Sequence, residues 1–169
     1  TLLSTGGWST FNRSVPLGAS LWSQGSVGTA FPTGAHQGAP TSFVLVNFNS
    51  TTGTGTISNW LLGPNRTFRN GDTISFFTRS PSTTFPDRLQ LRLSQNGNSS
   101  DVGSTATSVG DFTTLLLDIN PTYGANYPTV WTQFTVTISG LSGPTSGRFA
   151  FRYFVENGGP SGANSNIIG

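Results

Sequence analysis

The sequence contains no cysteine and no methionine, and all eight of its basic side chains are arginine because lysine is also missing. Without cysteine the chain can form no disulfide, no thiolate nucleophile and no cysteine-ligated metal site. Charged side chains make up 8% of the residues, against about 25% in an ordinary soluble domain. Because no initiator methionine is present, we expect the chain to be a piece of a longer precursor whose flanking N- and C-terminal segments are missing.

The low charge excludes several classes of function. The formal net charge is +2 and no basic run occurs, which argues against a nucleic-acid partner despite the isoelectric point of about 9.7. No apolar run approaches the roughly 18 residues of a transmembrane helix. Low charge with abundant threonine, serine and glycine is typical of secreted surface proteins. We therefore expect a secreted, extracellular and cell-surface-associated protein without a transmembrane segment in this chain.

Strand patterns recur along the chain, whereas helical periodicity is almost missing. Short apolar or alternating runs are bounded by glycine, proline, asparagine and serine, as β-strands are. Residues 1–169 fit about one domain, and so many short strands favour an antiparallel jelly-roll β-sandwich, an all-β fold. The predicted strands lie near Ser20–Gln24, Ser42–Phe48, Gly55–Leu62, Asp72–Arg79, Arg88–Ser94, Phe112–Ile119, Thr132–Ser139, Arg148–Val155 and Asn166–Ile168.

The clearest alternation lies in the predicted strand Arg88–Ser94. Leucines occupy every second position, at Leu89, Leu91 and Leu93, and polar side chains lie between them. Because successive side chains point to opposite faces of a strand, one face should meet the core and the other should meet water. The following stretch, Ser94–Gly110, is rich in glycine, serine and threonine, and we expect it to be a long loop.

Several motifs in a fixed order resemble those of a known family. The motifs are Asn47-Phe-Asn49, Gly55-Thr-Ile-Ser-Asn-Trp-Leu-Leu62, Asn70-Gly-Asp-Thr-Ile-Ser-Phe-Phe-Thr-Arg79, Phe85-Pro-Asp-Arg-Leu-Gln-Leu-Arg-Leu-Ser94 and Phe149-Ala-Phe-Arg-Tyr-Phe-Val-Glu156. Their order resembles choice-of-anchor J proteins and the related cleaved-adhesin domains of gingipain-type haemagglutinins, from about Trp8 to Gly169. The resemblance implies a galactose-binding-like jelly roll, secretion, and adhesion or surface display rather than catalysis.

The chain departs from this family at both ends. Such domains usually open with an aromatic-acidic strand before the position of Gly7-Trp8, and they close with an acidic strand after Ile168-Gly169. Without a final strand, we expect an unpaired edge at Asn166, Ile167 and Ile168, which a strand from another chain can fill. The alternative is that the chain was simply trimmed.

Catalytic patterns are weak, and we expect no catalytic residues. Nucleophilic catalysis needs a base held beside the nucleophile, but the single histidine, His36, has no Gly-x-Ser-x-Gly motif near it. Glycosidases need two carboxylates on facing positions, and no predicted strand carries two acids on one face.

Oxygen ligands for a metal are few. Asp87, Asp118 and Glu156 are the candidate ligands for a Ca²⁺ ion, with backbone carbonyl groups completing its shell. This expectation comes mainly from the family resemblance, and no other cofactor is implied. In the alternative interpretation Asp87 pairs with a neighbouring arginine such as Arg88, and Glu156 simply precedes a turn.

A sugar site requires exposed aromatic rings beside polar side chains. Tyr123, Tyr127 and Trp131 lie in one aromatic stretch, and Arg152 and Asn157 are candidates for a polar rim. Trp131 can instead begin the next strand.

The sequence thus predicts a non-enzymatic surface module that acts in adhesion or as a self-associating subunit of a filament or sheath. Its partners would be copies of itself, joined by strand complementation at the terminal edge. The alternative is a carbohydrate-binding adhesin that recognises cell-surface or matrix glycans, with Ca²⁺ as a candidate cofactor.

Overall fold

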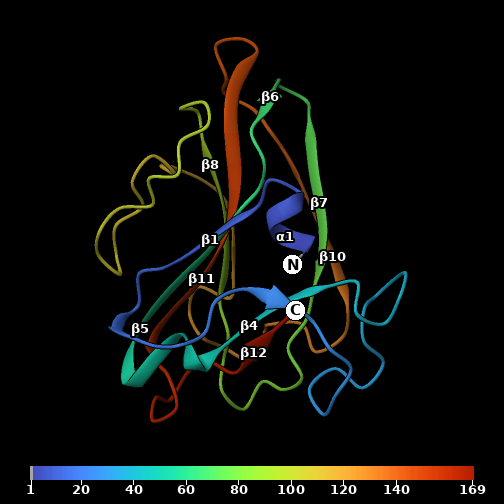
Figure 1. The fold of residues 1–169 in the computed structure, drawn as a ribbon, viewed down its shortest axis with the longest axis vertical. Helices are drawn as coiled ribbons and strands as arrows, with labels where there is room; N and C mark the ends of the chain where they lie inside the picture. The colour runs from blue at the N-terminus through green and yellow to red at the C-terminus, as the bar shows by residue number, and fades with distance from the viewer. Residues whose placement is uncertain (1) are drawn as a thin grey trace.

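The computed structural model describes residues 2–169 and contains 41% strand and 3% helix. Its larger sheet has the strand order β1-β5-β11-β8-β9, with β2 beside β5 and β6 beside β11 (Figure 1). Every pairing in it is antiparallel. The strands are β1 (Ser9–Asn12), β2 (Val15–Leu17), β5 (Thr51–Leu62), β6 (Arg66–Phe68), β8 (Leu89–Ser94), β9 (Thr114–Ile119) and β11 (Thr145–Gly158).

A second layer packs against this sheet and is built from two small antiparallel groups, β10-β7 and β12-β4-β3. Gly169 joins the two groups, because it exchanges both backbone hydrogen bonds with Arg79, at 3.0 and 3.2 Å. The strands are β3 (Ser23–Gln24), β4 (Val44–Asn47), β7 (Thr73–Thr78), β10 (Thr132–Thr137) and β12 (Ile167–Ile168); a short helix α1 (Leu2–Thr5) and a 3₁₀ turn η1 (Phe48–Ser50) complete the elements. The predicted all-β antiparallel sandwich is confirmed.

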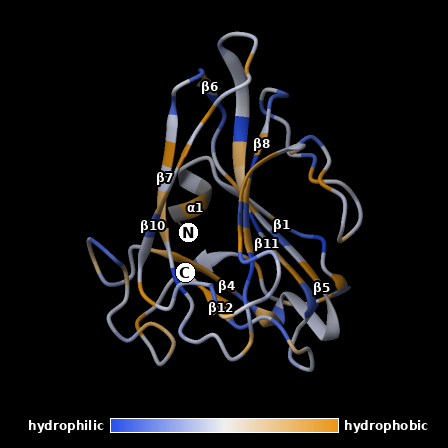
Figure 2. Ribbon diagram, turned by 180° about the vertical axis from the view of Figure 1, so that it is seen from behind, coloured by the Kyte–Doolittle hydropathy of each residue, from blue (hydrophilic) through white to orange (hydrophobic). Residues whose placement is uncertain are grey.

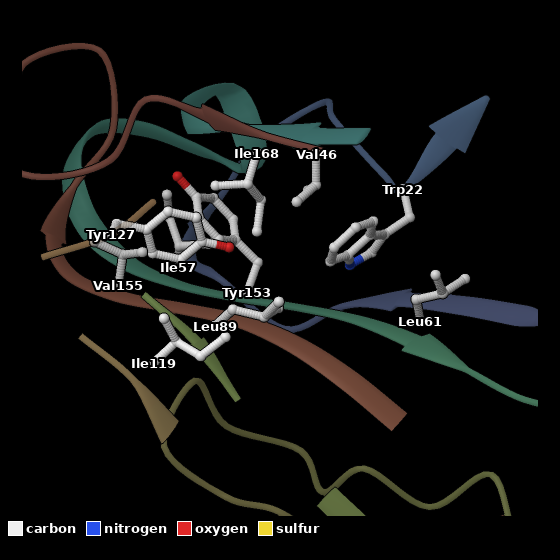
Figure 3. Close-up of a cluster of buried hydrophobic side chains, with 10 residues drawn as sticks. All are labelled: Trp22, Val46, Ile57, Leu61, Leu89, Ile119, Tyr127, Tyr153, Val155 and Ile168. Atoms are coloured by element: carbon white, nitrogen blue, oxygen red, sulfur yellow. The ribbon is translucent and has the colours of Figure 1, made fainter. Parts of the chain in front are cut away.

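The core lies between the two layers. The predicted inward leucines of β8, Leu89, Leu91 and Leu93, are 3%, 1% and 2% exposed. Apolar and polar stretches alternate along the long strands (Figure 2), as a half-buried strand requires. The central cluster shown in Figure 3 contains Trp22, Val46, Ile57, Leu61, Leu89, Ile119, Tyr127, Tyr153, Val155 and Ile168.

The polar face of β8 does not meet water, and that expectation was wrong. Gln90 on this face is 3% exposed, because the predicted long loop folds back over the outer side of the larger sheet. Arg92 donates a hydrogen bond to the carbonyl oxygen of Phe112 at 3.1 Å. The Phe112 ring is buried against Trp60, with the ring centroids 5.7 Å apart. The larger sheet is therefore covered on both faces.

Three strands were not predicted. β1, β2 and β6 are three or four residues long, and β2 contains a proline at its centre. Such short runs show too few alternations to stand out, and proline removes one strand hydrogen bond. In residues 2–169 we find no helix with the length and apolar character needed to cross a membrane.

Candidate functional site

Strand β7 has an open edge. Arg79, just after β7, exchanges backbone hydrogen bonds with Gly169 on the side away from β10. Every second residue of a strand directs its backbone N–H and C=O groups to the same side. The backbone groups of Phe77, Ser75 and Thr73 therefore also point away from β10. Among the described strands, β10 is the only ladder partner of β7. Within residues 2–169, the backbone donors and acceptors of Thr73, Ser75 and Phe77 on this side therefore pair with no other strand.

Strand β4 faces the same gap from the other side. The amide of Phe48 donates to the carbonyl oxygen of Asn166 at 2.8 Å, and Val46 pairs with Ile168. By the same alternation, the backbone groups of Val44 point to the same side as those of Val46 and Phe48. They therefore face the space that lies beyond Gly169 in the direction of β12. We call this gap, bounded by Val44, Gly169 and the edge Thr73–Phe77 of β7, the strand slot. Figure 1 shows the C-terminus between β4 and the β7-β10 pair.

Hollows lie on both sides of the strand slot. A cavity of about 120 Å³ on its inner side is lined by Trp22, Phe76 and Phe151. A pocket of about 270 Å³ on its outer side is lined by His36, Phe77 and Trp131. Both hollows also touch Val44 and Gly169. The apolar core is therefore incompletely covered where the second layer is interrupted.

The predicted self-association edge at Asn166, Ile167 and Ile168 needs correction. Ile167 and Ile168 pair with β4, and Ile168 is fully buried in the central cluster (Figure 3). Both backbone groups of the next residue, Gly169, bind Arg79. These residues are therefore not a free edge, and the open edge belongs to β7 across the slot.

A buried carboxylate fixes the start of β12. Asp87 is 1% exposed, and its Oδ1 accepts hydrogen bonds from the Asn166 amide at 2.7 Å and the Tyr153 hydroxyl at 2.5 Å. Its Oδ2 accepts a hydrogen bond from the Ser80 hydroxyl at 2.6 Å. Burial raises the pKa of Asp87, and these three donors oppose that shift. Asp87 thus makes no pair with Arg88, contrary to the alternative considered above.

Asp118 and Glu156 lie in a separate polar cluster around Arg88. Asp118 binds Arg88 through two hydrogen bonds, at 2.9 and 2.7 Å, which raise the pKa of Arg88. The backbone amide of Glu156 donates to the Tyr123 hydroxyl at 2.9 Å, and its carboxylate lies 3.8 Å from Arg88.

The predicted calcium ligands do not fit a calcium site. Asp87 is buried and accepts hydrogen bonds from three protein donors, and Asp118 is held by Arg88 and Gln90. In the described part of the chain, no three side chains of the metal-ligating kinds gather closely enough to hold an ion. Ca²⁺ needs six to eight converging oxygen ligands, and these carboxylates do not converge.

The predicted sugar-contacting residues are scattered. Tyr127 is 2% exposed, and its hydroxyl lies 2.7 Å from that of Thr78, so it is unsuited to contact a ligand. Tyr123 belongs to the Arg88 cluster, and Asn157 is exposed at the β-bulge between Val155 and Gly158 of β11, with φ of 53°. Of the three predicted aromatic residues, Trp131 lies in the outer pocket.

Arg152 is a structural residue and not part of an exposed rim. It is 2% exposed, and its guanidinium lies 4.8 Å from the ring centre of Trp60 and 3.9 Å from that of Phe154. Its Nη2 donates to the carbonyl oxygens of Ala106 and Ser108, at 2.5 and 3.3 Å. Both lie in residues 95–113 between β8 and β9, which we call the covering loop. Burial, and then the neighbouring arginines, lower the pKa of Arg152. This side chain holds the loop on the sheet.

The sequence did not mark Val44, Phe77 or His36 as residues that border a binding surface. One signal was available on the outward face of β7. Thr73 and Ser75 on this face have small polar side chains, whereas Phe77 has a large apolar one. No local signal marked Val44, because its role depends on a strand pairing between distant parts of the chain.

No protein-family model and no curated protein sequence matches this chain. Among solved structures it is similar to three cleaved adhesin domains of Lys-gingipain, two of them identified as from Porphyromonas gingivalis. The K1 domain has a TM-score of 0.60 and 20% identity, covering 96% of this chain and 85% of that domain. The K2 domain has a TM-score of 0.61 and 18% identity over the same shares.

The K3 domain gives a TM-score of 0.57 at 16% identity, covering 96% of this chain and 87% of that domain. At these identities the likeness concerns the fold. The chain has the β-sandwich fold of cleaved adhesin domains, which confirms at the level of the fold the resemblance identified from the sequence.

Proposed function

We propose that this protein is a non-enzymatic, extracellular adhesion module that joins copies of itself by accepting an extended β-strand into the strand slot. The observation that carries the proposal is the pair of facing backbone edges, β7 on one side and Val44 on the other. A strand inserted between them would pair with both edges and complete the second layer.

The free energy of strand binding would come mainly from apolar side chains that cover the inner cavity. Phe76 and Phe151 are partly buried, with ring centres 4.8 Å apart, and both border the slot. Apolar side chains of an incoming strand would cover these rings, and burial of apolar surface contributes about 25 cal/mol per Å². Side chains opposite Phe76 would point inward, and those opposite Ser75 and Phe77 would point outward.

Two general features support adhesion between copies. The chain shares its fold with domains that are adhesins. Its net charge of +2 and its 8% of charged residues give little electrostatic repulsion between like molecules. An extracellular, surface-associated location follows from the same proposal.

The side chains that could support catalysis do not form a catalytic arrangement. His36 stacks on Phe77 with ring centres 3.8 Å apart, and the two carboxylates of the Arg88 cluster, Asp118 and Glu156, both face the guanidinium of Arg88. The buried Asp87 is satisfied by protein donors. This distribution supports a binding role rather than a hydrolytic one.

The test compares proline substitutions on the two edges of the β7-β10 ribbon. Ser75→Pro removes an amide that faces the slot, whereas Thr135→Pro removes one that faces the opposite edge. The two hydroxyls lie 2.7 Å apart and bind each other, so both variants lose the same side-chain bond. We expect the natural protein and Thr135→Pro to assemble at high concentration, as seen by sedimentation and electron microscopy, and Ser75→Pro to remain dispersed.

Circular dichroism of both variants provides the folding control. Equal assembly by Ser75→Pro and Thr135→Pro, with both folded, would contradict strand capture at β7. A natural protein that stays monomeric at every concentration would contradict self-association.

A further inference from the structure

The outer pocket carries a second inference that goes beyond strand capture. It lies over the strand slot on the solvent side of the second layer, because Phe77 alternates with the core-facing Phe76. Rings from the loop before β4, from β7 and from the residue just before β10 form its walls. We call it the ring pocket, and its lining includes His36, Gln37, Ser42, Phe43, Phe77 and Trp131.

The walls of the ring pocket are held in place from behind. The indole nitrogen of Trp131 donates to the carbonyl oxygen of Gly34 at 3.0 Å. Its ring stacks on Phe31, which is 1% exposed, with centroids 5.9 Å apart. Phe43 meets Trp131 edge-on at 5.7 Å. These contacts fix the aromatic surfaces before any ligand arrives, which lowers the ordering cost of binding.

The loop that carries His36 is closed on itself. The amide of Ala35 donates to the carbonyl oxygen of Pro40 at 3.0 Å, and the amide of Ser42 donates to that of Ala39 at 2.8 Å. The His36 ring lies nearly parallel to Phe77, with an interplanar angle of 19°. The imidazole therefore covers one face of the Phe77 ring, and both rings line the pocket.

Polar side chains at the pocket are available to a ligand. Within residues 2–169 the imidazole of His36, the amide of Gln37 and the hydroxyl of Ser42 form no hydrogen bond with another protein group, while each residue is exposed. The side chains that line it in this described part of the chain include no carboxylate and no guanidinium. The pocket therefore offers aromatic ring surface and neutral hydrogen-bonding side chains.

We propose that the ring pocket binds one pyranose ring of a neutral glycan. A pyranose has C–H faces that pack on aromatic rings and hydroxyls that bond to amide, hydroxyl and imidazole groups, which is the combination present here. The absence of an arginine side chain from the lining in the described residues favours a neutral sugar over an acidic one, since a buried anion needs a cationic partner. The volume of about 270 Å³ suits a single ring.

The pocket and the slot are separable by experiment. Val44, Gly169 and Phe77 border both the pocket and the slot, and an outward side chain of a captured strand would reach the pocket beside Phe77, so glycan binding is measured on dispersed protein. Ser75 is not among the residues that line the pocket, and glycan binding should thus survive the Ser75→Pro substitution. Loss of assembly without loss of glycan binding would show that glycan binding does not require strand capture.

The test is a titration of the full chain with methyl glycosides of glucose, galactose, mannose and N-acetylglucosamine, followed by nuclear magnetic resonance and repeated with short oligosaccharides. We expect saturable binding to at least one neutral sugar. Gln37→Ala and His36→Ala should each weaken it by about tenfold, a loss of the size of one hydrogen bond to a ligand. The control Gln95→Ala changes an exposed glutamine outside the pocket and should leave binding unchanged.

Two results would overturn the proposal. They are no saturable binding to any of these neutral sugars, or binding unaltered by both Gln37→Ala and His36→Ala. Because His36 and Gln37 are exposed, loss of folding is not expected to confuse the result, and chemical shifts outside the pocket verify this in the same spectra.

Discussion

Asp87 shows how one buried side chain positions the candidate site. It receives three hydrogen bonds, from Ser80, Tyr153 and the backbone of Asn166, and so connects the start of β8 to the start of β12. A buried carboxylate without a cationic partner is costly to ionise, which agrees with the direction of its pKa shift. The residue that the sequence suggested as a calcium ligand thus has a structural role in fixing one end of the slot.

This environment predicts how stability depends on pH. The pKa of Asp87 in the folded state lies above its ordinary value of 3.8, so between the two values the folded chain holds more protons than the unfolded chain. The free energy of unfolding should therefore gain a contribution as the pH falls through the raised pKa, and that contribution should level off below about pH 3.8.

Urea unfolding of the natural protein and of Asp87→Asn, at intervals between about pH 7 and pH 4, measures this effect. The other carboxylates are common to both proteins, so the difference between the two curves isolates Asp87. We expect the natural protein to gain stability relative to Asp87→Asn as the pH falls. A difference that is constant with pH would contradict a raised pKa of Asp87 within this range, and a change in the opposite direction would show that folding stabilises the charged carboxylate.

At the scale of elements, the alternation of apolar and polar residues predicted the positions of several strands and the apolar face of β8. The leucine face of β8 and the strands β7 and β10 lie close to their predicted positions. Alternation cannot report which strand lies beside which, because that depends on pairings such as Ile168 with Val46 across the whole chain. The free edge was therefore expected at β12 and is found at β7.

The position of the covering loop, residues 95–113, is a second feature that the sequence pattern could not predict. Its glycine, serine and threonine residues predicted a loop but gave no indication that it would bury the polar face of β8. Arg152 is the reason, since its guanidinium stacks on rings of the sheet and binds the loop carbonyl groups of Ala106 and Ser108. A planar fork of donors suits this role, and the point charge of lysine does not.

Arg152→Lys should therefore loosen the loop while leaving the sheet folded. We expect a loss of about 2 kcal/mol in the free energy of unfolding, from lost hydrogen bonds at a buried position, and faster proteolytic cleavage within residues 95–113. Urea unfolding and limited proteolysis measure the two effects. The exposed Arg69→Lys provides the control, and equal behaviour of the two variants would mean that Arg152 does not hold the loop.

At the scale of the whole molecule, the sequence predicted the architecture better than the site. The all-β sandwich and its likeness to cleaved adhesin domains are confirmed. Of the residues expected to contact a ligand, Trp131 lies in a pocket, whereas Tyr127 and Arg152 are buried. A tryptophan or tyrosine serves packing and recognition equally well, so residue type alone could not separate these roles.

The central claim is that the edge of β7 accepts a strand from another copy. Residue-resolved hydrogen exchange, compared between dispersed and assembled protein, tests it directly because a new strand ladder protects the amides that it engages. We predict that the amides of Thr73, Ser75 and Phe77 become slow to exchange on assembly, while those of Gln133, Thr135 and Thr137 on the opposite edge of β10 stay fast. Unchanged exchange at the three β7 amides in assembled protein would contradict strand capture in the slot.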